Sequence, residues 1–205
     1  MKISWIHEHT ELAGASLEKK IEIFHAKVWG WAIHVAELLA NGGKSHDKVG
    51  DATAVPDVGP IPGNGFAVLQ ILLSYFEMIG IYKEGVENPI GRSGELFKKG
   101  FADVFPEIAS IPPATAEVFL NKLYKAARCG LYHKLGTGEG FGITGDMTPV
   151  ITMSADGKEI VLNPHTLPAC LNNHLRSFCD RLSDPANAQL RANFEKCFDL
   201  DNPKP

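Results

Sequence analysis

The chain has 205 residues, of which 44% are hydrophobic and 21% are charged, and its formal net charge is −4. These proportions indicate a soluble globular protein that is large enough to bury a hydrophobic core. The negative net charge argues against a protein that coats nucleic acid through bulk positive charge, although a local basic patch is compatible with it.

The N-terminal sequence and the cysteines indicate a reducing compartment. The first residues, MKISWIHEHTELAG, lack the apolar stretch and cleavage site of a secretory signal. Because the cysteines form no C-x-x-C pair and no regular framework, we expect free thiols in a cytoplasmic protein. They are Cys129, Cys170, Cys179 and Cys197.

The first half of the chain predicts two long helices separated by a loop. Apolar residues recur at helical spacing over 17–40, and Asn41-Gly42-Gly43 ends this helix. Residues 42–64 are rich in Gly, Pro and Asp and predict a long loop, which is often a functional type of segment. Residues 65–84 predict an apolar helix. Because Gln70 and Glu77 interrupt it, we expect a core helix and no membrane span, which needs ~20 clean apolar residues.

The second half predicts further helices around one β-hairpin. Helices are expected over 93–104 and 114–135, and the glycine-rich connector GTGEGFGITGD follows the second of them. In the segment VITMSADGKEIVL, an Asp-Gly pair between alternating apolar residues predicts a hairpin over 149–163. Two closing helices are expected over 166–183 and 187–199.

These elements predict a mainly α fold, a bundle of about five to six helices with one inserted β-hairpin. We expect a single domain over 1–205. Within it, residues 1–64 supply the N-terminal helix and the long loop, and residues 65–205 supply the bundle core with the hairpin.

The helix over 114–135 carries the most informative polar residues. At ~100° per residue, Lys122, Lys125, Arg128 and His133 fall in one sector that contains no carboxylate, opposite an apolar face. Such a basic sector suits a phosphate ester. His133 lies in the last helical turn, where the helix dipole favours the imidazolium form of a general acid. The alternative is an ordinary solvated helix face.

The stretch Arg128-Cys-Gly-Leu-Tyr-His133 resembles the R-x-x-x-x-H signature of the HEPN superfamily, and the R-C-G-L-x-H version resembles a variant found in uncharacterised bacterial HEPN-like proteins. The resemblance covers about residues 65–183. Members are small all-α proteins, and many are endoribonucleases of toxin–antitoxin and defence systems. The resemblance implies a HEPN-like fold, RNA as the substrate, a homodimer and an antitoxin-like protein partner.

The same resemblance implies a metal-independent reaction in which the ribose 2′-hydroxyl attacks the adjacent phosphate. Arg128 would stabilise the developing charge, and His133 would transfer protons. Family nucleases often carry Asn or Asp directly after the arginine, where this chain has Cys129. The alternative is therefore a catalytically silent HEPN-like module that binds or scaffolds RNA, a nucleotide or a protein partner.

The remaining candidates support this site or are set aside. Lys122, Lys125 and Lys134 are expected to contact substrate, and Cys129 to support the site. Glu77 is expected either to hold Arg128 by a salt bridge or to lie exposed at a helix edge. The spacing of His7-Glu8-His9 is wrong for two ligands on one helix face, and the glycine-rich connector lacks Gly-Lys-Ser/Thr. We therefore expect no metal and no cofactor.

Overall fold

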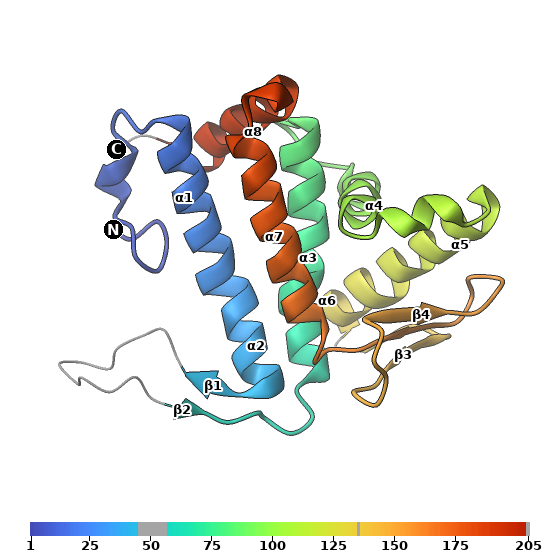
Figure 1. Cartoon of the computed structure of the whole chain (residues 1–205). Helices are drawn as coiled ribbons and strands as arrows, with labels where there is room; N and C mark the ends of the chain where they lie inside the picture. Colours follow the sequence, from blue (N-terminus) through green and yellow to red (C-terminus); the bar gives the residue numbers. More distant parts are fainter. Residues whose placement is uncertain (45–56, 135, 204–205) are drawn as a thin grey trace. The chain divides into compact units, whose positions relative to one another are not determined.

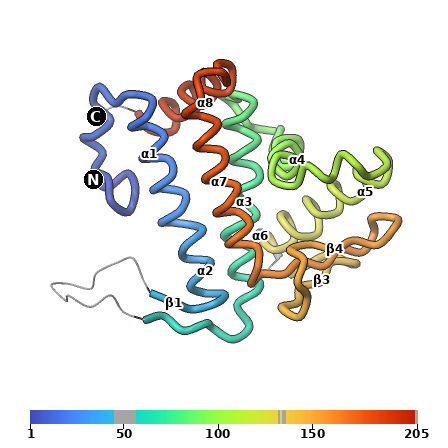
Figure 2. Tube along the Cα trace, in the orientation of Figure 1, coloured from blue at the N-terminus to red at the C-terminus, as the bar shows by residue number. Residues whose placement is uncertain are grey.

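The computed structural model describes residues 1–44, 57–134 and 136–203 and is mainly helical, with small strand elements (Figure 1). It divides into two compact units. Unit 1 consists of 1–32, 75–106 and 171–205, and unit 2 of 33–74 and 107–170. Figure 2 shows how each unit draws on distant parts of the chain: unit 1 combines the blue first helix, green middle helices and the red C-terminal helices. The predicted single domain over 1–205 stays a prediction.

Unit 1 is a helical unit with an aromatic core. Its helices are α1 (Leu17–Val28), α4 (Ser93–Val104), α8 (Ala188–Asp201), the second half of α3 (Gly65–Glu84) and the larger part of α7 (Leu167–Ser183). Ser16 begins α1, because its side chain accepts a hydrogen bond from the Lys19 N–H. The ring of Phe24 lies 4.8 Å from that of Tyr82 in α3, 5.3 Å from Phe194 in α8 and 6.2 Å from Phe178 in α7. Three helices therefore pack around one aromatic side chain of α1.

Two glycines bring α3 and α4 into backbone contact. A Cβ atom at Gly80 would collide with the carbonyl oxygen of Leu96, and one at Gly100 with that of Phe76. Only glycine fits at such a crossing, because any side chain would push the two helices apart. Unit 1 also contains two short 3-10 turns, η1 (His9–Leu12) and η5 (Pro185–Asn187).

Unit 2 combines helices with a small sheet. It holds α2 (His34–Asn41), the first half of α3, and the helical segment formed by α5 (Pro113–Lys122), η4 (Leu123–Cys129) and α6 (Gly130–Lys134). A 3-10 turn, η3 (Pro106–Ser110), precedes α5. The sheet has the order β3-β5-β4, with β3 (Phe141–Ile143) parallel and β4 (Ile151–Met153) antiparallel to β5 (Ile160–Leu162). The turn before β5 lies against α5, since a Cβ at Gly157 would be 2.9 Å from the Thr115 carbonyl oxygen.

The pairing register of the sheet places the buried residues of β5 opposite apolar residues of β3 and β4. Ile160 pairs with both Phe141 and Met153, and Leu162 pairs with both Ile143 and Ile151. Ile160 and Leu162 are buried, whereas Val161 between them is only half-buried. Alternate residues of β5 thus face the interior of unit 2, as expected for a strand with one covered face.

Most helix boundaries agree with the sequence analysis, and three details differ. The predicted first and fourth helices are each interrupted by a π-helical turn, η2 (Trp29–Ile33) and η4. The connector after the fourth helix contributes strand β3, which the sequence analysis had not predicted. The ends of the predicted 42–64 loop pair as the short strands β1 (Gly43–Lys44) and β2 (Asp57–Val58), while residues 45–56 lie outside the described residues.

Helix α3 is long and apolar enough to cross a membrane by length and composition, and it is the one such helix within the described ranges. Half of its most apolar window is buried inside the protein. The core helix of a soluble protein passes the same test.

Candidate functional site

The helical segment with the R-x-x-x-x-H motif contains a π-helical turn. Pro113 begins α5 at a position where proline is favoured, and the backbone changes to π-helix at Leu123. At the end of η4 the Gly130 N–H points to the Lys125 carbonyl, five residues back. Hydrogen bonds of this kind widen the helix, so each residue of a π turn advances by less than the ~100° of an α-helix. The angular positions expected for an uninterrupted α-helix are therefore wrong within Leu123–Cys129.

The structure places four of the predicted groups on this one segment of unit 2. Arg128 lies in η4 and is half-buried, while His133 lies in α6 and is exposed. Lys125 is exposed and Lys122 is half-buried. The side chain of Lys134 lies outside the described residues. An arginine fixed in a π turn and an exposed histidine one turn later can contact one anionic ligand from the solvent side.

The glycine-rich connector packs back against the same segment. The Gly138 N–H donates to the Ala126 carbonyl at 3.2 Å. A Cβ at Gly130 would be 2.8 Å from the Gly136 carbonyl oxygen, and the Lys122 Nζ abuts Gly140. Side chains at these glycines would push the connector away, so the glycines are explained by close backbone approach. The connector thus covers the Ala126 and Lys122 side of the helix, and its glycines have no need of a phosphate ligand.

Gln70 connects α3 to α6. Its side-chain nitrogen donates to the Leu131 carbonyl at 2.8 Å. Carbonyls at a helix C-terminus lack partners within the helix, so this bond satisfies one of them and ties α6 to the first half of α3. In the sequence, Gln70 stands out only as an interruption of the apolar run. A single amide side chain in an apolar helix is the sequence feature that could have indicated this hydrogen bond.

The two residues predicted to support the site have different positions. Cys129 follows Arg128 in η4 and is half-buried, and it is a free thiol. Glu77 is half-buried in the part of α3 that belongs to unit 1, whereas Arg128 belongs to unit 2. The predicted roles of both residues stay predictions.

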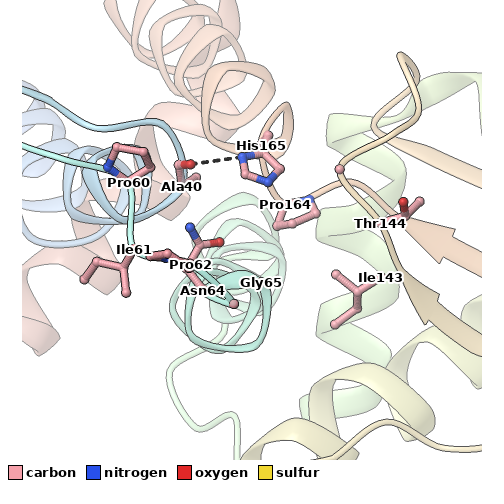
Figure 3. A pocket seen from close by; sticks show the side chains of 12 residues that line it. Ala40, Pro60, Ile61, Pro62, Asn64, Gly65, Ile143, Thr144, Pro164 and His165 are labelled. Carbon is pink, nitrogen blue, oxygen red and sulfur yellow. Dashed lines mark hydrogen bonds between the residues drawn. The ribbon is translucent and has the colours of Figure 1, made fainter.

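A second candidate site in unit 2 is a pocket of about 350 Å³ around His165 (Figure 3). Its walls come from the end of α2, the start of α3, the residues after β3 and the Pro164-His165 pair. The apolar lining is rich in proline, and no Asp, Glu, Lys or Arg side chain lines it among the described residues. The lining residues are Ala40, Pro60, Ile61, Pro62, Gly63, Asn64, Gly65, Ile143, Thr144, Gly145, Pro164 and His165.

The imidazole of His165 is held in one orientation. Its Nδ1 lies 3.0 Å from the Ala40 carbonyl oxygen and 3.1 Å from Asn41 Oδ1, and both of these atoms accept hydrogen bonds. Nδ1 is therefore the donor in both contacts. The backbone of Gly145 packs closely against the imidazole ring, because a Cβ atom at Gly145 would be 2.6 Å from the His165 Cδ2. Sequence reasoning missed His165, whose one signal is its place after Asn163-Pro164.

Unit 1 contains a buried charge cluster around Asp103. The Asp103 carboxylate is 6% exposed and contacts Lys83 Nζ at 2.7 Å, Arg181 Nη2 at 2.5 Å and His174 Nε2 at 3.1 Å. The other ring nitrogen of His174 lies 2.8 Å from the Tyr75 hydroxyl. Burial alone would raise the pKa of Asp103, but hydrogen bonds from His174, Arg181 and Lys83 outweigh it and hold the pKa well below its usual range. This cluster joins α3, α4 and α7.

The four cysteines are free in the structure. Burial raises the pKa of Cys179 to about 12 and that of Cys197 to about 11, so both thiols are protonated near neutral pH. Among the described residues, no group of three or more His, Cys, Asp or Glu side chains is arranged to hold a metal ion.

Comparison with known proteins adds no relative. No protein-family model matches the chain, and neither a curated protein nor a solved structure matches it.

Proposed function

We propose that this chain is a HEPN-like protein that binds RNA at the end of its fourth predicted helix and cleaves it without a metal ion, as a homodimer. The observation that carries the proposal is the π-helical turn at the motif. It holds Arg128 half-buried, directly before the short helix that presents His133 to solvent. π turns inside α-helices occur frequently at functional sites. The mainly helical architecture is compatible with the proposed family.

The proposed reaction needs two groups from each protomer. The ribose 2′-oxygen attacks the adjacent phosphorus, and the bond from phosphorus to the 5′-oxygen breaks. Arg128 stabilises the negative charge that develops on the phosphate oxygens. His133 exchanges protons with the attacking or the leaving oxygen, a role that suits an exposed imidazole. Lys125, which is exposed two turns earlier, binds the RNA backbone.

The test is cleavage of end-labelled RNA oligonucleotides in the presence of EDTA. We expect Arg128→Ala and His133→Ala each to lower the cleavage rate by about 10²-fold or more. Lys158→Ala, which removes an exposed cation from the hairpin turn of the same unit, serves as the matched control and leaves the rate unchanged. A 2′-deoxy substitution at the scissile nucleotide abolishes cleavage. Cleavage that survives both motif variants would refute the proposed site.

The homodimer is tested by light scattering after size exclusion. We expect the mass of a dimer at micromolar concentration. A monomer at every concentration, together with metal-independent cleavage that depends on Arg128 and His133, would refute the proposed dimer and leave the proposed site in place.

The second candidate function is a HEPN-like module that binds RNA, a nucleotide or a protein partner without cleaving RNA. Cys129 favours it, because a half-buried thiol stands where a polar residue would orient a substrate, and thiols are weak hydrogen-bond donors. In this case RNA is bound and remains intact. Lys125→Ala then weakens binding and reduces its dependence on salt, whereas His133→Ala leaves the affinity within about twofold.

A further inference from the structure

Unit 1 contains a pocket of about 560 Å³ that neither the motif nor the proposed function uses. It lies between the N-terminal segment, α1 and α7, and volumes of this size hold small organic ligands. Trp5 and Trp29 form its aromatic side, with ring centroids 5.5 Å apart. Ile21 and Cys179 add apolar surface deeper in the pocket.

The Trp5 side of the pocket is fixed before any ligand arrives. The indole ring of Trp5 packs on the backbone of Gly30, where a Cβ would collide with the ring. The segment that carries Trp5 is closed by backbone hydrogen bonds from Ile3 N–H to the His7 carbonyl at 2.9 Å and from His9 N–H to the Met1 carbonyl at 2.7 Å. A preformed aromatic wall lowers the ordering cost of binding.

One fixed positive charge in this pocket lacks a partner. Among the described residues, Arg176 of α7 forms no hydrogen bond and no ion pair, and this exposed residue lines the pocket. His25 of α1 lies near it and likewise has no hydrogen-bond partner in the described part of the chain. Burial lowers the pKa of His25, and the charge of Arg176 lowers it further. The imidazole is therefore neutral near pH 7, and Arg176 supplies the charge.

The two carboxylates at the rim are engaged elsewhere. Glu22 pairs with Lys19 at 3.2 Å and with His7 at 3.4 Å. The pKa of Glu18 is lowered by a backbone hydrogen bond at the start of α1 and by a hydrogen bond from Ser16. Glu22 is thus held by cationic partners of its own, and neither carboxylate pairs with Arg176 among the described residues.

We propose that this pocket binds a small organic carboxylate with an aromatic or branched apolar body. The carboxylate pairs with the guanidinium of Arg176 and accepts a hydrogen bond from His25, and the apolar body lies against Trp5 and Trp29. Arginine binds a carboxylate through two parallel N–H···O bonds.

The test uses three probes with the same body and different charge: 3-phenylpropionate, 3-phenylpropanamide and 3-phenylpropylamine. Binding is followed by the tryptophan emission of the full chain. Two of its three tryptophans line the pocket, whereas Trp31 lies outside it. We expect saturable binding of the carboxylate, with an affinity at least tenfold higher than that of the amide or the amine.

Arg176→Gln is expected to lower the affinity for 3-phenylpropionate at least tenfold while the far-UV circular dichroism stays unchanged. Arg92→Gln is the matched control, because Arg92 pairs with Glu95 on its own helix, away from the pocket, and it leaves the affinity unchanged. Trp29→Phe reduces the emission change and so locates the ligand. Equal affinity for all three probes, stronger binding of the amine, no saturable signal, or full binding by Arg176→Gln would each overturn the proposal.

Discussion

Two histidines, one in each unit, show how differently this protein uses the same side chain. His174 in unit 1 is 9% exposed, and its two ring nitrogens contact Asp103 and Tyr75. His133 in unit 2 is exposed near the C-terminus of a helix. The first holds three helices together through these contacts, whereas the second is exposed at the surface of its unit. Buried polar groups of unit 1 therefore belong to its stability, and reactive chemistry is expected at the surface of unit 2.

Removal of Asp103 is the strongest test of that contrast. Asp103→Ala leaves Lys83, His174 and Arg181 facing each other without their shared carboxylate. We expect a loss of about 3–5 kcal/mol in the free energy of unfolding, measured by urea titration with circular dichroism. Asp180→Ala, on the exposed side of the same α7, is the control and changes this free energy by less than about 0.5 kcal/mol. Equal losses of unfolding free energy in the two variants would show that the Asp103 cluster does not stabilise unit 1.

The glycine crossing between α3 and α4 is the next largest effect in unit 1. In Gly100→Ala the new methyl group meets the Phe76 carbonyl and forces the two helices apart. Overpacking of this kind costs about 3 kcal/mol, which thermal unfolding measures. Gly59→Ala introduces a methyl group with no atom within 4 Å and is expected to keep the wild-type melting temperature. A wild-type melting temperature for Gly100→Ala would show that the two helices are not in backbone contact.

The pH dependence of stability separates the charge of Asp103 from its packing. The pKa of Asp103 is lower in the folded protein than its unfolded value of about 3.9. The stabilisation is therefore complete above about pH 4 and decreases as the pH falls further. We expect wild-type stability to fall by at most about 1.4 kcal/mol per pH unit more than that of Asp103→Asn between pH 4 and pH 2.5. Parallel curves for the two proteins would contradict a salt-bridged Asp103.

The smallest expected effect concerns His133 itself. His133→Ala changes the free energy of unfolding by less than about 0.5 kcal/mol, because the side chain is exposed. His174→Ala breaks two buried hydrogen bonds and is expected to cost about 2 kcal/mol. A large stability loss in His133→Ala would assign this residue to the fold and weaken its proposed catalytic role.

Local signals in the sequence predict the helices well. The apolar run from 65 to 84 and the breaks at Asn88-Pro89 and Pro106 place α3 and α4 at the residues where the structure has them. The two π turns could not be predicted, because no residue type favours them. At each of them a distant segment contacts the helix: the Trp5 ring packs on Gly30 in η2, and Gly138 donates to the Ala126 carbonyl in η4.

The candidate sites could be predicted only where a motif exists. Arg128, His133 and their neighbouring lysines share one helix, so spacing alone places them on one segment. Arg176 and His165 show no such pattern. The pocket at Arg176 arises from α1, α7 and the N-terminal segment, which are far apart in the chain. Strand β3 could not be predicted for the same reason. It pairs with β5, which is not its neighbour in the chain, because β4 lies between them.

The way unit 1 is assembled has a consequence for its synthesis on the ribosome. Lys20 of α1 bonds to Asp199 of α8, a partner 179 residues away in the chain. At ~5–20 residues per second, α8 is made about 10–35 s after α1. During this interval Phe24 of α1 lacks its contact with Phe194 of α8. Unit 1 is therefore expected to depend on holdase chaperones while it is made, and to aggregate when translation outpaces them.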